Sequence, residues 1–209
     1  MIKHKNQRVA ILIDVQNMYY SARNLFNARV NFGEVVKEAV SDRQLIRSVA
    51  YVVRTKTGEE RPFFEALTKL GIETKEKELQ EFFGGAKKAD WDVGMTVDAI
   101  RFAETVDVII LVSGDGDFVS LVEYLKNKGK QVEILAFGET TSARLKETAD
   151  GFTDLSSDKD RFLIGASRGA APRPKTQTPE RRRPAKAPAH RVERRTGLQP
   201  RPRYSLKDL

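Results

Sequence analysis

Residues 108–117 read VIILVSGDGD, and this stretch decides the fold class of the chain. Its leading residues are apolar without interruption and mostly β-branched, which is typical of a strand buried on both faces of a parallel sheet. A similar run, VAILID at residues 9–14, also ends in an aspartate. Ligands bind beyond the carboxyl ends of the strands in open α/β sheets, so the acids after both runs indicate a polar site at that edge.

Strand and helix patterns alternate on either side of these two runs. Further strands are expected at residues 45–53, 72–79, 131–137 and 152–155, the second of them more exposed because charged residues alternate along it. Helices are expected at residues 18–28, 31–39, 59–70, 90–105, 118–128 and 140–149. This alternation predicts an α/β fold, specifically a three-layer α/β/α sandwich with a central, mainly parallel sheet.

The helix expected over residues 90–105 carries apolar residues at helical spacing. We expect one face of it to be buried, formed by Val93, Val97, Ile100 and Ala103.

The segment before that helix, residues 80–89, is expected to be a partly apolar loop that borders the acidic helix start. Lys87 and Lys88 are candidates for binding the backbone of a nucleic-acid substrate, and Phe82 or Phe83 for stacking on a base. A solvated loop without a binding role fits the same residues equally well.

Charge divides the chain into a body and a tail. Residues 1–165 contain 24 basic and 26 acidic residues, whereas residues 166–209 contain 13 basic and 3 acidic residues and 7 of the 8 prolines. We expect a flexible leader at residues 1–7, a folded domain at residues 8–165 and a disordered Arg/Pro-rich tail after it. A polyanion such as RNA is the natural partner of this tail, although charged runs are usually only solvated.

The composition also excludes several kinds of catalysis. The chain has no cysteine, and its two histidines, His4 and His190, lie in the leader and in the tail. A serine–histidine–aspartate triad and a histidine-ligated zinc site are therefore not expected in the body. No apolar run approaches the roughly 20 residues of a membrane-spanning helix, and the N-terminus does not resemble a signal peptide. We expect a cytoplasmic protein with no membrane partner, and the sequence leaves homo-oligomerisation open.

Four aspartates occupy the positions where a site is expected. Asp14, Asp115 and Asp117 follow the two buried strands, and Asp92 begins a helix. Carboxylates brought together repel one another, and a hard divalent cation with oxygen ligands, Mg²⁺ or Mn²⁺, relieves that repulsion. Each acid also has an ordinary structural interpretation, as a helix cap, a turn residue or an acid that interacts with a helix dipole.

Three blocks of the sequence resemble a known family. They are IDVQN at residues 13–17, KADWDVGMTVD at residues 88–98 and SGDGDF at residues 113–118. In this order they resemble the NYN domain, and more narrowly its bacterial LabA/DUF88 branch, within the PIN-like nuclease superfamily. The resemblance covers about residues 8–157 and does not extend to the tail.

The resemblance implies a PIN-like sandwich with an acidic pocket for Mg²⁺ or Mn²⁺ and ribonuclease activity, with single-stranded RNA as the favoured substrate. The catalytic and metal-binding residues that it implies are Asp14, Asp92, Asp115 and Asp117. It also implies supporting roles for Asn17, which would orient Asp14 or a bound water, for Ser113, which would hydrogen-bond a phosphate or another ligand, and for Asp98.

Two other functions are compatible with the sequence. The LabA/DUF88 branch includes regulatory members, so a non-enzymatic module that binds nucleic acid or protein is the first alternative. The second is a phosphatase of the haloacid dehalogenase type, because residues 115–119 resemble its D-x-D-x-[TV] motif, although they lie late in the chain. A dinucleotide-binding loop is disfavoured because the third glycine of that motif is missing.

Overall fold

The computed structural model of this 209-residue chain describes residues 3–54, 60–78, 80–81, 87–88 and 90–165. The side chains at positions 80, 81, 87 and 88 are not among the described ones. The predictions for the tail and for Phe82 and Phe83 therefore lie outside the described residues.

The described elements alternate as the sequence predicts. The strands of the main sheet are β1 (Arg8–Asp14), β3 (Gln44–Arg54), β4 (Glu73–Glu78), β7 (Val108–Val112), β8 (Gln131–Ala136) and β9 (Gly151–Asp154). The helices are α1 (Val15–Phe26), α2 (Phe32–Val40), α3 (Arg61–Lys69), α4 (Asp92–Ala103), α5 (Val119–Asn127), α6 (Ala143–Thr148) and α7 (Lys159–Phe162). Short 3₁₀ turns are η1 (Gly116–Phe118), η2 (Gly138–Thr140) and η3 (Leu155–Asp158).

Two short antiparallel pairs accompany the main sheet. One joins β2 (Arg29–Val30) to β10 (Leu163–Ile164), and the other joins β5 (Gln80–Glu81) to β6 (Lys87–Lys88). The second pair lies in the segment that the sequence predicts to be loop, so that prediction is wrong for the backbone of these residues. Each strand of this pair is only two residues long, which is too short to give a recognisable strand pattern in the sequence.

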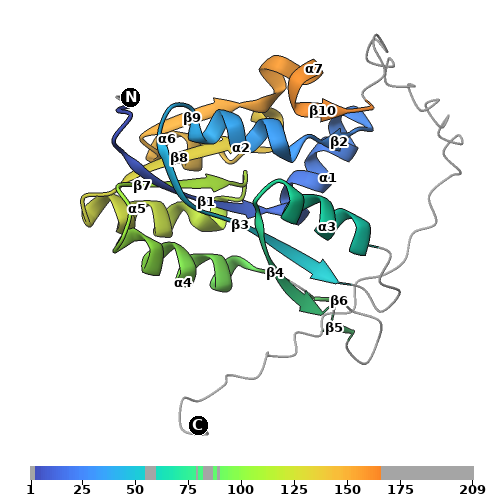
Figure 1. Cartoon of the computed structure of the whole chain (residues 1–209), viewed down its shortest axis with the longest axis horizontal. Helices are drawn as coiled ribbons and strands as arrows, with labels where there is room; N and C mark the ends of the chain where they lie inside the picture. Colours follow the sequence, from blue (N-terminus) through green and yellow to red (C-terminus); the bar gives the residue numbers. More distant parts are fainter. Residues whose placement is uncertain (1–2, 55–59, 79, 82–86, 89, 166–209) are drawn as a thin grey trace, which may run out of the picture. The chain divides into compact units, whose positions relative to one another are not determined.

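The main sheet is parallel throughout, with the strand order β4-β3-β1-β7-β8-β9 (Figure 1). The chain first moves outward from β1 through β3 to β4 and then returns to place β7 on the other side of β1. Such a reversal opens a crevice beyond the carboxyl ends of the two central strands, because the crossovers on either side lie on opposite faces. The predicted α/β fold with a central parallel sheet is confirmed.

Helices cover both faces of this sheet. Helices α1 and α2 contact β3, whereas α4 contacts β7 and α5 contacts β8. Figure 1 shows α2 and α4 on opposite sides of the strands. All residues from Val9 to Ile13 and from Val108 to Val112 are buried. Strands without polar side chains can occupy only this central position, which explains why the two strongest apolar runs become neighbours.

Helix α4 buries a different face from the one that its apolar pattern predicts. Three of the four residues expected in the core are exposed, namely Val93, Val97 and Ile100, and Val93 is 74% exposed. The buried positions of the helix are Met95, Asp98, Ala99 and Ala103. The prediction is correct only for Ala103. Its failure follows from Asp98, which the pattern treats as solvent-facing although neighbouring strands supply polar partners for its carboxylate.

The last described segment packs against α2. The backbone N–H of Asn31 donates to the carbonyl of Phe162 at 2.8 Å. The guanidinium of Arg161 donates to Glu34 at 3.0 Å and to Glu38 at 2.7 Å. The chain is therefore part of the packed body as far as β10. Among the described residues, no helix combines the length and the apolarity that crossing a membrane requires.

Candidate functional site

Asp14 ends β1 at the crevice and joins three pieces of structure. Its backbone is extended and it caps α1, because its Oδ1 accepts a hydrogen bond from the N–H of Asn17 at 3.0 Å. Its Oδ2 accepts a hydrogen bond from the hydroxyl of Ser113, at the end of the neighbouring strand, at 3.2 Å. The interpretation of Asp14 as a helix cap is confirmed, and its second oxygen adjoins the residues that follow β7.

The segment after β7 folds on itself through its own side chains. Ser113 is buried, and its hydroxyl accepts a hydrogen bond from the N–H of Asp115 at 3.2 Å while it donates to Asp14. Asp115 in turn accepts from the N–H of Asp117 at 3.0 Å and caps the turn η1. The hydroxyl of Ser113 therefore binds within the protein, whereas the resemblance implies a hydrogen bond to a phosphate or another ligand.

Asn17 links α1 to the same segment. Its side-chain oxygen accepts a hydrogen bond from the N–H of Gly114 at 3.0 Å. The resemblance implies that Asn17 orients Asp14 or a water. In the structure its backbone N–H contacts Asp14, and its amide side chain contacts Gly114 instead. Asn17 therefore holds the ends of β1 and β7 at a set distance from each other.

Glycine at position 114 allows a third segment to approach closely. A Cβ on Gly114 would lie 2.9 Å from Oγ1 and 3.1 Å from Cα of Thr141, so any larger residue would displace that backbone. The N–H of Ser142 donates to the carbonyl of Gly114 at 3.0 Å. The sequence predicts no role for Thr141 and Ser142 as supports of the site. No local pattern identifies them, because their contact with Gly114 exists only between elements that are distant in sequence.

Three of the predicted acids converge at the crevice. Asp92 begins α4, and Asp115 and Asp117 follow β7; one carboxylate oxygen from each lies within 4.8 Å of the other two. Asp92 and Asp115 are half-buried and Asp117 is exposed. Asp14 is not in the group that meets this distance among the described residues, but it adjoins the group through Ser113.

The electrostatics of the crevice are visible at Asp14. Burial, with a smaller contribution from the nearby charges of Asp92 and Asp115, raises the pKa of its carboxyl to about 6. The hydrogen bonds from Asn17 and Ser113 oppose this shift by stabilising the carboxylate. A positive charge placed among these acids would lower the pKa again. The three converging carboxylates offer only oxygen atoms as ligands, and such a donor set fits a hard divalent cation, Mg²⁺ or Mn²⁺.

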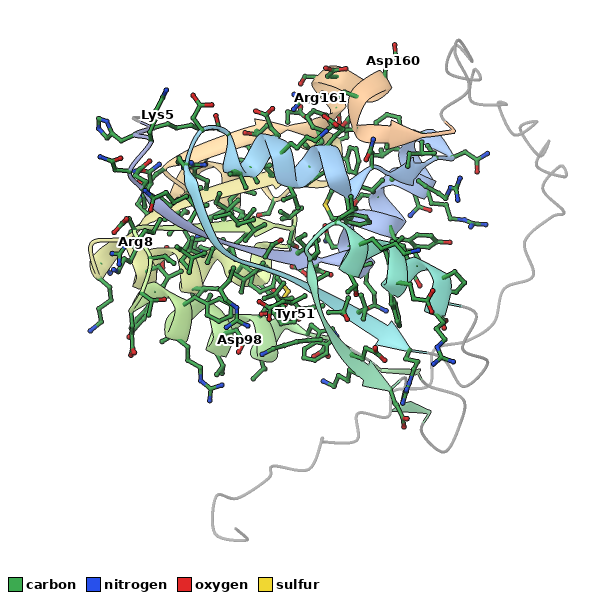
Figure 2. The ribbon with its side chains drawn as sticks, in the orientation of Figure 1. Lys5, Arg8, Tyr51, Asp98, Asp160 and Arg161 are labelled. Atoms are coloured by element: carbon green, nitrogen blue, oxygen red, sulfur yellow. The ribbon has the colours of Figure 1, made fainter. Side chains whose placement is uncertain are left out.

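Asp98 lies apart from the three converging acids, in a buried cluster between α4 and the sheet. It is 5% exposed and accepts hydrogen bonds from the hydroxyl of Tyr51 at 2.8 Å and from the ammonium of Lys75 at 2.5 Å (Figure 2). Burial works to raise the pKa of Asp98, but the bonds from Lys75 and Tyr51 outweigh it and lower the pKa. Asp98 therefore remains ionised and ties α4 to β3 and β4.

Trp91 fixes the start of α4, where Asp92 lies. Its indole N–H donates to the carbonyl of Val52 at 3.0 Å, and its ring packs edge-on against Tyr51 with 5.3 Å between the ring centroids. The ammonium of Lys77 lies over the same ring and donates to the carbonyl of Asp90 at 2.9 Å. These contacts hold Asp92 at the crevice. The predicted substrate contacts of Lys87 and Lys88 concern side chains outside the described ones.

A parallel sheet whose strand order reverses beside three converging carboxylates defines an α/β domain with a candidate oxygen-donor metal site. The sequence profile of the NYN domain matches residues 8–156, and the chain therefore belongs to the NYN domain family.

Two relatives illustrate this membership. The chain is 27% identical over 163 residues to the low amplitude and bright protein LabA of Synechococcus elongatus, a match that covers 71% of this chain and 83% of LabA. The crystal structure of a protein of unknown function from Vibrio parahaemolyticus superposes with a TM-score of 0.70 at 34% identity. That match covers 78% of this chain and 100% of the Vibrio protein.

Proposed function

We propose that this chain is a metal-dependent ribonuclease that hydrolyses phosphodiester bonds in RNA. The observation that carries the proposal is the approach of Asp92, Asp115 and Asp117 to within 4.8 Å at the strand-order reversal of a NYN domain. These carboxylates would hold Mg²⁺ or Mn²⁺ directly or through water, with Asp14 beside them. A cation bound there supplies a more acidic water and stabilises negative charge on the scissile phosphate.

The residues around these acids support the same function. Because its pKa is about 6, Asp14 is ionised at neutral pH yet titrates close to it, which suits a carboxylate that accepts a proton from water. The two histidines lie at positions 4 and 190, so residues 8–165 contain no imidazole base. Asn17, Ser113 and Gly114 hold Asp14 and the segment after β7 together, which keeps the acids in place.

Incubation of the purified full chain with labelled single-stranded RNA and Mn²⁺ or Mg²⁺ tests the proposal. Cleavage is expected with either cation and is expected to stop in EDTA. Asp115→Asn removes one of the three converging carboxylates, and we expect it to lower the cleavage rate about 100-fold or more. The matched control is Asp160→Asn, which changes an exposed acid on α7 that Figure 2 shows at the surface; this variant is expected to cleave at the parent rate.

The same samples distinguish the alternatives. Mn²⁺ should raise the melting temperature of the parent and of Asp160→Asn by mass action, and should raise that of Asp115→Asn less. RNA that is bound but not cleaved would support a non-enzymatic binding module instead. Hydrolysis of a generic phosphate ester without action on RNA would support a phosphatase. Cleavage by Asp115→Asn at the parent rate would contradict the proposed site.

A further inference from the structure

A pocket outside the acidic crevice lies on α1 and the β2–β10 pair. It has a volume of about 220 Å³ and is open to solvent. The residues that line it include Tyr19, Arg23, Asn27, Arg29, Ile164 and Gly165. The acids of the crevice do not line this pocket, so the two sites are separate on the described part of the chain.

Two cations of this pocket lack acidic partners. Most arginines of the described residues form ion pairs with carboxylates, as Arg8 and Arg161 do. Within the described part of the chain, Arg23 and Arg29 have no such pair, and both are exposed. The guanidinium of Arg23 donates to the hydroxyl of Tyr19 at 2.8 Å and lies 5.9 Å from the centre of its ring. This contact orients Arg23 without neutralising it, which suits binding of a phosphate.

Exposed aromatic rings accompany the two arginines. Tyr19 is 42% exposed and Tyr20 is 56% exposed, and the two rings meet edge to face with 5.4 Å between their centroids. Exposed aromatic side chains beside unpaired arginines are the combination that binds single-stranded nucleic acid, because the rings stack on bases while the cations contact phosphates. An acidic protein would use the arginines but would not need the exposed rings.

The position of the pocket relates it to the crevice. Asp14 caps the first turn of α1, and Tyr19 and Arg23 lie further along the same helix. With a rise of 1.5 Å per residue, they are about 8 and 14 Å from Asp14 along the helix axis. The acids of the crevice repel phosphates, so an approaching strand needs positive charge close by. Gly165 also lines the pocket, and in the sequence the Arg/Pro-rich segment follows it directly.

We propose that Tyr19, Tyr20, Arg23 and Arg29 form a binding surface for single-stranded RNA that leads along α1 to the acidic crevice. The inference rests on the proposed ribonuclease function for its substrate, and it adds the residues that hold the strand away from the acids. Phosphates contact Arg23 and Arg29, and an unpaired base stacks on Tyr20.

Binding of labelled single-stranded RNA to the full chain in EDTA tests this surface without cleavage. The variant Arg23→Gln/Arg29→Gln is compared with Lys5→Gln/Lys128→Gln, which removes two charges near the amino ends of the strands, where Figure 2 shows Lys5. The first variant is expected to bind about tenfold more weakly at low salt. The slope of log affinity against log salt should fall by about 1.4, since each phosphate contact on a single strand contributes about 0.7. The lysine variant should bind as the parent does.

A third variant separates stacking from charge. Tyr20→Leu keeps an apolar side chain but removes the ring, and we expect about fivefold weaker binding with an unchanged salt slope. Melting temperatures close to that of the parent would exclude misfolding, because the altered side chains are exposed. If the parent binds RNA without cleaving it in the presence of a cation, the ribonuclease proposal fails, but the comparison of the variants still tests RNA binding at this surface. Equal binding by the arginine and lysine variants, or no RNA binding by the parent, would overturn the inference.

Discussion

Asp14 combines a structural and a chemical role in one side chain. One oxygen caps α1 through the N–H of Asn17, and the other accepts the hydroxyl of Ser113. The same carboxyl is buried near Asp92 and Asp115, so its pKa rises to about 6. Helix capping stabilises the fold, whereas the buried negative charge destabilises the metal-free protein.

This conflict predicts a pH dependence of stability. The folded chain keeps the proton on Asp14 between about pH 4 and pH 6, where the unfolded chain has lost it, so the free energy of unfolding falls as pH rises through that window. The loss is complete above pH 6. Asp14→Asn removes this pH-dependent loss. Between pH 4 and pH 7.5 the free energy of unfolding of the variant should therefore rise, relative to that of the parent, by at most about 3 kcal/mol.

Urea unfolding in EDTA at a series of pH values measures this gain. The control is Asp160→Asn, whose carboxyl is exposed on α7. Its difference from the parent should not change with pH across the same window. A constant difference between Asp14→Asn and the parent would show that the carboxyl of Asp14 titrates normally.

Helix α4 has two faces with apolar residues, and the face that it buries is the one that carries Met95, Ala99 and Ala103 together with the carboxylate of Asp98. Val93, Val97 and Ile100 form an apolar row that is exposed, whereas Asp98 turns inward to Tyr51 and Lys75. With this face of α4 buried, the ring of Trp91 packs against Tyr51, and that contact positions the start of the helix. The direction in which Asp92 enters the crevice therefore depends on contacts two turns away.

The orientation of α4 can be tested by paired substitutions. Asp98→Ala should lower the free energy of unfolding by about 2–4 kcal/mol, because the buried hydroxyl of Tyr51 loses its acceptor and Lys75 loses its ion pair. Val93→Ala should change it by less than about 0.5 kcal/mol, since that side chain is 74% exposed. Denaturant titrations of both variants provide the measurement, and equal losses would contradict the described orientation.

At the scale of the whole molecule, charge is separated along the chain. Residues 1–165 carry a formal net charge of −2 and residues 166–209 one of +10. The acids of the crevice belong to the first segment, so long-range attraction for the proposed RNA substrate would come mainly from the second. We predict that deleting residues 166–209 lowers RNA affinity at low salt about tenfold or more and flattens its salt dependence.

Fluorescence anisotropy measures the RNA affinity of the deletion variant and of the full chain. The measurement is repeated over a range of salt concentrations to give the salt dependence of each. The melting temperature should stay within a few degrees, because the described residues as far as β10 form a packed core of their own. Cation-dependent cleavage should persist. Unchanged affinity with an unchanged salt slope would show that the tail does not hold RNA.

Much of the fold is predictable from the sequence because its signals are local. The apolar runs at residues 9–13 and 108–112 identify the central strands, and the alternation of elements identifies the parallel sheet. Asn31 and Pro62 lie at helix starts as their chemistry predicts. The acids at the strand ends are found in the same way, since carboxyl ends of neighbouring parallel strands share one edge.

The α/β class, the family resemblance and the set of candidate acids can all be inferred from the amino-acid sequence, because each depends on residues that are close together in the chain. The three-dimensional fold was needed to see that Asp92 lies beside Asp115 and Asp117, while Asp98 pairs with Tyr51 and Lys75. Apolar periodicity cannot assign a buried carboxylate to a face, because its burial depends on donors that distant strands supply.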